Sequence, residues 1–201
     1  MLLSTSLIIA AYLLGSISTA IIVCRLMKLP DPRSVGSKNP GATNVLRVGG
    51  EKGKKAAGLT LLGDSLKGFI PVLVASLLML EPLIIALVAA FSFLGHLFPI
   101  FFAFKGGKGV ATFFGAMLAV DLWIGLALLA TWLIVAYGLK ISSLSALIAA
   151  ILAPVYFWFF SPEPIYFWMS LFFCFALLLS HHSNIKNLVI GAEGKIKKNS
   201  T

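Results

Sequence analysis

The sequence predicts an all-α, polytopic integral membrane protein. Of its 201 residues, 59% are hydrophobic and only 11% are charged, and the mean hydropathy is +1.00. A soluble domain of this size needs far more charge to cover its surface. Apolar runs recur from one end of the chain to the other, so the bilayer is the natural solvent. We expect a single transmembrane domain over residues 1–201.

Seven apolar stretches are expected to form seven transmembrane helices, at residues 5–27, 56–80, 83–104, 110–120, 122–139, 144–160 and 165–180. The first lacks a basic leader and a cleavage site, so it is interpreted as a retained span rather than a signal peptide. The stretch 110–120 is short for a crossing of roughly 20 residues. It borrows flanking residues, crosses a thinned region or is partly re-entrant. Cys24 and Cys174 form no C-x-x-C pair and are interpreted as apolar side chains.

The connectors alternate in charge. Those at 28–55, 105–108, 140–143 and 181–201 carry the connector lysines and arginines, whereas Glu81-Pro82, Asp121 and residues 161–164 carry acids and no base. Basic loops stay in the cytoplasm. The pattern therefore predicts an N-terminus outside, a cytoplasmic C-terminus and an odd number of crossings. It also accounts for much of the net charge of +9 without nucleic acid.

The stretch "FKGGKGVAT", residues 104–112, combines glycines with two lysines. Lys108 is followed by glycine, so this is not a Walker A loop. Glycines nevertheless allow backbone N–H groups to approach an anion, and the helix that follows favours negative charge at its start. With Lys105 and Lys108, the stretch predicts a phosphate site. The alternative is a glycine turn with lysines that only set topology.

The stretch "GSKNPGATNVLR", residues 36–47, is the second candidate phosphate site. Short polar side chains surround a Pro-Gly turn, and Arg47 carries a planar fork suited to two phosphate oxygens. The alternative is a capped interfacial turn with Arg47 reaching to lipid headgroups.

A third cluster, "GDSLKG", places Asp64 and Lys67 three residues apart, on one helix face. A structural ion pair is the favoured interpretation, with direct substrate contact as the alternative. Ser142 and Ser143 begin one apolar helix, and "SHHSNIKN" ends another. His96 is a candidate to brace the glycine loop that follows it.

Together these clusters resemble the bacterial acyl-phosphate:glycerol-3-phosphate acyltransferase family. The resemblance rests on "GSISTA", "GSKNPGATNV", "GDSLKG" and "GHLFPIFFAFKGGKGVAT", in the expected order over nearly the whole chain. It implies transfer of a fatty acyl group from acyl phosphate to the 1-hydroxyl of sn-glycerol 3-phosphate. The products would be lysophosphatidic acid and phosphate, in the first acylation of bacterial phospholipid synthesis. The chain lacks the H-x-x-x-x-D motif of soluble acyltransferases.

The resemblance also implies residue roles. Four residues are expected to be catalytic: Ser37, Arg47, Lys108 and His181. The expected contacts to the phosphates and to glycerol 3-phosphate are Gly41, Ala42, Thr43, Asn44, Lys105, Gly106, Gly107, Ser142, Ser143 and Asn184. Among these, Gly41, Ala42, Gly106 and Gly107 are expected to donate backbone N–H groups. Either the substrate's own phosphoryl oxygen or a protein base takes the hydroxyl proton.

No cofactor or metal is expected, because the acids are scattered and form no carboxylate cluster. The expected setting is the bacterial inner membrane with the site facing the cytoplasm, and a functional link to an enzyme that produces acyl phosphate. Two other classes of protein are alternatives. An organophosphate transporter should show repeated halves and polar residues on several spans at mid-bilayer. A non-catalytic protein that binds anionic lipid would explain the basic loops but not three glycine-rich clusters.

Overall fold

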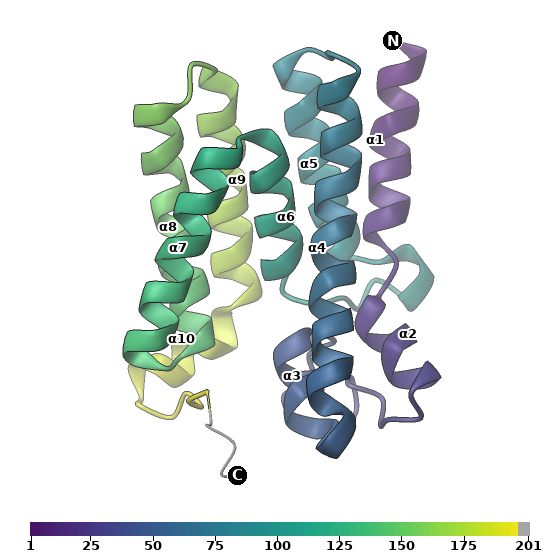
Figure 1. The fold of residues 1–201 in the computed structure, drawn as a ribbon, viewed down its shortest axis with the longest axis vertical. Helices are drawn as coiled ribbons and strands as arrows, with labels where there is room; N and C mark the ends of the chain where they lie inside the picture. The colour runs from purple at the N-terminus through teal and green to yellow at the C-terminus, as the bar shows by residue number, and fades with distance from the viewer. Residues whose placement is uncertain (197–201) are drawn as a thin grey trace. The chain divides into compact units, whose positions relative to one another are not determined.

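A computed structural model describes residues 1–196, which form helices joined by turns and short connectors, with no strand in this range (Figure 1). The chain divides into two compact units, residues 1–120 and the part from Asp121 onward. A single domain over the whole chain remains a prediction. The first unit contains α1 (Leu2–Gly15), α2 (Thr19–Leu26), α3 (Ala42–Val48), the 3₁₀ helix η1 (Gly50–Lys52), α4 (Gly53–Leu77), α5 (Pro82–Leu97), the 3₁₀ helix η2 (Ile100–Phe102) and α6 (Val110–Val120). The second contains α7 (Leu122–Leu139), α8 (Ser142–Phe160), α9 (Pro164–Ser180) and α10 (His182–Val189).

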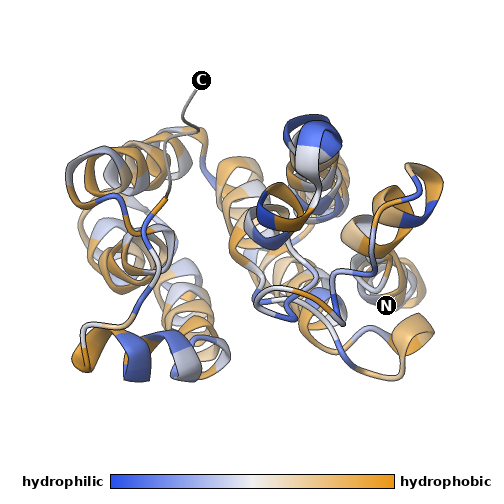
Figure 2. Cartoon of the chain, turned by 90° about the horizontal axis from the view of Figure 1, so that it is seen from below, coloured by the Kyte–Doolittle hydropathy of each residue, from blue (hydrophilic) through white to orange (hydrophobic). Residues whose placement is uncertain are grey.

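Within residues 1–196, four helical segments are long and apolar enough to cross a bilayer: Gly50–Leu77, Pro82–Phe102, Leu122–Leu139 and Ser142–Phe160. Two bent pairs, α1 with α2 and α9 with α10, raise the number to six if each pair is one span. The helix α6 has only 11 residues. Seen from below, most helices are coloured as hydrophobic, whereas hydrophilic residues colour the connectors and parts of a few helices (Figure 2). The chain is therefore a helical membrane protein by composition, and seven crossings with a fixed orientation remain a prediction.

Small residues let the helices of the first unit approach closely. Gly68 on α4 faces the backbone of Thr112 on α6, and Gly115 on α6 faces the backbone of Ser65 on α4. A side chain at either glycine would overlap the neighbouring backbone. Helices in membranes associate through such small residues, because lipid supplies little hydrophobic driving force between them. This packing holds the short helix α6 beside α4, and it fixes the segment of α4 that carries Asp64 and Lys67.

The first apolar stretch is not one continuous helix. Its two parts, α1 and α2, meet at an angle of 43° around Ser16, Ile17 and Ser18. After the break, α2 packs beside α3 and the start of α4 through Ala20, Cys24, Val45 and other apolar side chains. The break therefore sets the direction in which the chain enters the first polar loop.

In the second unit, α8 packs against both α7 and α9. Thr131 and Tyr156 share a hydrogen bond of 2.9 Å between α7 and α8. Phe157 and Tyr166 stack edge to face between α8 and α9. The chain bends by 65° between α9 and α10. This bend places His181 at the junction of the two helices.

Candidate active site

Asn44 organises the first polar loop. It lies in α3 with 1% of its surface exposed, and its Oδ1 accepts a hydrogen bond of 2.9 Å from the backbone N–H of Ser37. Its Nδ2 donates to the carbonyls of Pro32, at 2.8 Å, and Val35, at 3.1 Å. Both amide hydrogens are thus used within the loop. Asn44 therefore holds the loop together, and the phosphate contact expected from the sequence stays a prediction.

Three other predicted residues of this loop are exposed: Ser37, Thr43 and Arg47. Arg47 lies in the last turn of α3 and forms no ion pair within residues 1–196. Gly41 and Ala42 lie at the start of α3, and the N–H of Gly41 donates to the carbonyl of Asn39 at 2.9 Å. The loop therefore presents side chains of Ser37, Thr43 and Arg47 at its surface, as a phosphate site requires.

Arg33, in contrast, is already engaged. Its guanidinium lies 2.6 Å from Asp31 Oδ2, and its backbone N–H donates to Asp31 Oδ1 at 2.9 Å. These hydrogen bonds hold the pKa of the Asp31 carboxyl below its usual range. The pair closes a turn at residues 31–34 and leaves Arg47 as the loop arginine with no carboxylate partner among the described residues.

The glycine loop, residues 104–109, folds back under the C-terminal end of α5. The N–H of Gly106 donates to the carbonyl of Leu97, and the N–H of Gly107 donates to the carbonyl of His96, both at 3.2 Å. These two N–H groups are therefore occupied by the protein. They close the loop onto α5, and the contact with phosphate expected from the sequence stays a prediction.

The lysines of this loop differ in their exposure. Lys105 is exposed, whereas Lys108 is half-buried. Gly109 follows with a φ of +86°, a left-handed conformation that glycine adopts without strain. The chain can therefore turn sharply into α6 directly after Lys108. This turn marks where the lysine-bearing loop ends and α6 begins.

The two polar loops of the first unit meet at Gly107. A Cβ placed on Gly107 would lie 3.1 Å from the carbonyl oxygen of Pro40. Pro40 directly precedes Gly41, so the two candidate phosphate sites converge although they lie far apart in the sequence. The geometry brings Lys105 and Lys108 into the same region as the start of α3.

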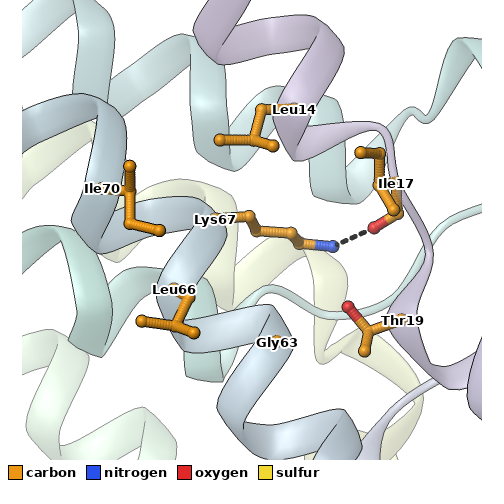
Figure 3. A pocket seen from close by; sticks show the side chains of 7 residues that line it. All are labelled: Leu14, Ile17, Thr19, Gly63, Leu66, Lys67 and Ile70. Carbon is orange, nitrogen blue, oxygen red and sulfur yellow. Dashed lines mark hydrogen bonds between the residues drawn. The ribbon is translucent and has the colours of Figure 1, made fainter.

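A buried ion pair lies near this region, in α4. Lys67 Nζ is 2.9 Å from Asp64 Oδ1, and both side chains are 4% exposed. The ammonium also donates to the carbonyl of Ile17, at 2.9 Å, in the break between α1 and α2 (Figure 3). A cavity of about 120 Å³ adjoins Lys67, and apolar side chains such as Leu14 and Ile70 line it. The pair thus satisfies a backbone carbonyl that the helix break leaves without a helical partner.

The second unit holds the other predicted residues. Ser143 Oγ and Asn184 Nδ2 both donate to Glu193 Oε1, at 2.6 Å each. Buried His181 has its Nδ1 2.9 Å from the carbonyl of Leu177, and Ser142 is half-buried at the start of α8. Glu193 is not among the residues predicted from the sequence. Its one available signal was that it is the only acid in the basic segment 181–201.

Within residues 1–196 no group of three or more His, Cys, Asp or Glu side chains is placed to hold a metal ion. The chemistry that these clusters offer is therefore that of cations, hydroxyls and amides. Such groups suit the binding of phosphate oxygens and the stabilisation of developing negative charge.

Comparison with known proteins decides the family. The family model described as glycerol-3-phosphate acyltransferase matches residues 5–191. The chain belongs to the glycerol-3-phosphate acyltransferase family. Proteins of that name from Thioalkalivibrio sulfidiphilus and Ruthia magnifica are 57% and 53% identical to it, over 98% and 97% of this chain and 95% and 98% of theirs.

Solved structures agree with this assignment. The chain is 35% identical to PlsY (YgiH), an integral membrane glycerol 3-phosphate acyltransferase. The match to its glycerol 3-phosphate form covers 96% of each chain with a TM-score of 0.90. The lysophosphatidic acid form matches with a TM-score of 0.85, over 96% of this chain and 94% of that one. PlsY is thus known in a glycerol 3-phosphate form and in a lysophosphatidic acid form.

Proposed function

We propose that the protein transfers a fatty acyl group from acyl phosphate to the 1-hydroxyl of sn-glycerol 3-phosphate, forming lysophosphatidic acid and inorganic phosphate. The observation that carries the proposal is the convergence of the two polar loops at Gly107 and Pro40, in a chain of this family. Both substrates bear a phosphate. A site that joins a loop arginine to two loop lysines supplies the cations they need.

At the acyl carbon, the reaction forms one bond and breaks one. The 1-hydroxyl oxygen attacks the acyl carbonyl carbon, and the bond from that carbon to the phosphate oxygen breaks. The hydroxyl proton passes to the departing phosphate, whose own oxygen serves as the base. Phosphate is a good leaving group, so the enzyme needs no covalent intermediate. Its contribution is the orientation of the two substrates and the stabilisation of the oxyanion.

The residues divide by what they offer. Arg47, Lys105 and Lys108 bind phosphate oxygens and stabilise the oxyanion, and Ser37 and Thr43 add hydroxyl contacts. Ser142, Ser143, His181 and Asn184 contact glycerol 3-phosphate. The carboxylate of Glu193 orients the Ser143 hydroxyl and the Asn184 amide, since it accepts a hydrogen bond from each.

The membrane setting follows from the charge pattern of the connectors. We propose seven crossings with α6 as the short one, the N-terminus outside and the site on the cytoplasmic face of the bacterial inner membrane. Cytosolic glycerol 3-phosphate then reaches the basic loops directly. A long acyl chain stabilises membrane binding by about 0.8 kcal/mol for each methylene that it buries in the bilayer. Acyl phosphate therefore reaches the site from within the bilayer, after another enzyme has produced it.

A donor comparison tests the proposal. Purified protein receives labelled glycerol 3-phosphate with acyl phosphate, acyl-CoA or acyl carrier protein bearing the same chain. We expect labelled lysophosphatidic acid with acyl phosphate alone. Product from a thioester donor at an equal rate would contradict the proposed donor, and no product from any donor would contradict acyl transfer.

A further inference from the structure

The imidazole of His96 lies directly against Gly107. His96 is in the last turn of α5 and is 6% exposed. A methyl group added at Gly107 would overlap His96 Nε2 and lie 3.0 Å from His96 Cε1. Real side chains do not approach this closely, so any residue larger than glycine displaces either the ring or the loop. Protein neighbours alone thus account for a glycine at this position.

His96 holds the loop through its backbone as well. Its carbonyl accepts the N–H of Gly107, and the neighbouring carbonyl of Leu97 accepts the N–H of Gly106. On its other side Gly107 faces the carbonyl of Pro40. The loop is therefore fixed between the end of α5 and the turn that begins α3.

On its other side the ring faces Asp64 of α4. Its Nδ1 lies 3.8 Å from Asp64 Oδ1, which is too long for a hydrogen bond but within electrostatic range. Asp64 is in turn paired with Lys67, whose ammonium is fixed to the carbonyl of Ile17. A carboxylate on this side favours a proton on Nδ1, and the ring nitrogen that faces Gly107 then carries none. The contacts form a continuous path from the helix break to the glycine loop.

We propose that His96, which lies beside Asp64, is a positioning residue that sets the place of Gly107 against Pro40, and that its ring is the reason why position 107 is glycine. The inference rests on the proposed function, because the place of Gly107 sets the spacing between the two phosphate-binding loops. Misplacement of a positioned group by about 1 Å can cost an enzyme roughly 100-fold in rate. His96 touches neither substrate in this account.

A double-mutant cycle tests this. His96→Ala, Gly107→Ala and the double variant are compared with the wild type by KM for glycerol 3-phosphate, kcat and melting temperature. We expect Gly107→Ala alone to raise KM about tenfold or more, a factor that corresponds to about 1.4 kcal/mol. In the double variant the vacated ring volume accepts the methyl group. The KM of the double variant should therefore be no higher than that of His96→Ala alone. In each variant, kcat should change less than KM relative to the wild type.

Gly138→Ala is the matched control, because an added Cβ there meets nothing within 4 Å. It should behave as the wild type. Equal losses from Gly107→Ala with and without the ring would overturn the proposal, and so would a normal Gly107→Ala enzyme. If Gly107→Ala does not fold, the proposal predicts that the double variant folds, because the methyl group then has room. A double variant that does not fold, although His96→Ala alone folds, would contradict the proposal. The melting temperatures are measured without substrate turnover. This part of the test therefore does not depend on which acyl donor the enzyme uses.

Discussion

At the scale of single residues, the two arginines of the first loop are the clearest contrast. Arg33 is bound by Asp31, whereas Arg47 is exposed without such a partner in residues 1–196. We expect Arg47→Ala to lose about 1.5–3 kcal/mol of transition-state stabilisation, or one to two decades in kcat/KM. Arg47→Lys should not restore full activity, because it lacks the planar fork. The activities of both variants are measured by the formation of labelled lysophosphatidic acid from labelled glycerol 3-phosphate.

Arg33→Ala is the control in the same loop and should lose less, since its guanidinium is engaged by Asp31. If Arg47→Ala turns over substrate at nearly the wild-type rate, the phosphate-binding role is contradicted and Arg47 serves only to set the membrane topology.

Asn44 gives a second prediction at this scale. Asn44→Asp keeps the oxygen that accepts the Ser37 N–H but removes both donors, so the carbonyl of Pro32 loses its partner and that of Val35 keeps only the N–H of Lys38. A buried polar group without a partner costs about 1–3 kcal/mol. We expect faster tryptic cleavage of the first loop, with Asn187→Asp in α10 as the control. Equal cleavage rates in both variants would contradict the loop-holding role.

The sequence indicated which residue types gather in the loops but not how each is used. Exposed Ser37, Thr43 and Arg47 fit the prediction that the loop offers polar groups, and the spacing of Asp64 and Lys67 indicated their ion pair. The use of Asn44 could not be read, since its partners lie seven to twelve residues away. The N–H groups of Gly106 and Gly107 close onto α5, a contact that composition alone does not signal.

At the scale of helices, the break in the first apolar stretch is the main feature that the sequence concealed. Residues 5–27 read as one span, but α1 and α2 meet at 43°. A break in a bilayer leaves backbone groups that need partners within the protein. Lys67 supplies one for Ile17. The pair was predicted from its spacing, and its location at the break was not.

This arrangement predicts an asymmetry in stability. Lys67→Met leaves Asp64 buried beside no cation, which typically costs about 3–5 kcal/mol. Adding Asp64→Asn removes that charge, so the double variant should melt at a higher temperature than Lys67→Met alone. Lys55→Met, at an exposed position near the start of α4, is the control and should melt as the wild type does. A double variant that melts no higher than the single one would contradict a role for the pair as a buried ion pair.

At the scale of the whole molecule, the predicted orientation is open to direct test. In a background with Cys24 and Cys174 replaced by alanine, single cysteines beside Lys54 or Lys140 should react only with reagents on the cytoplasmic side. Cysteines beside Glu81 or Glu163 should react only from outside. Labelling of both sets from one side would contradict the seven-span arrangement with its N-terminus outside.

The periodic apolar runs predicted most helices well. The run 122–139 matches α7, and the run 144–160 lies within α8 (Ser142–Phe160). The number of crossings could not be fixed from the sequence, because it depends on whether bent pairs and the 11-residue α6 traverse the bilayer. Helix length and hydropathy constrain such segments only weakly.

The central claim is acyl transfer with cleavage between the carbonyl carbon and the bridging oxygen of acyl phosphate. Acyl phosphate labelled with ¹⁸O at that bridging position tests it most directly, with the purified protein, glycerol 3-phosphate and ³¹P NMR. We predict that lysophosphatidic acid and inorganic phosphate form in equal amounts and that the phosphate carries the label. Release of unlabelled phosphate, with the label in free fatty acid and no lysophosphatidic acid, would contradict the account.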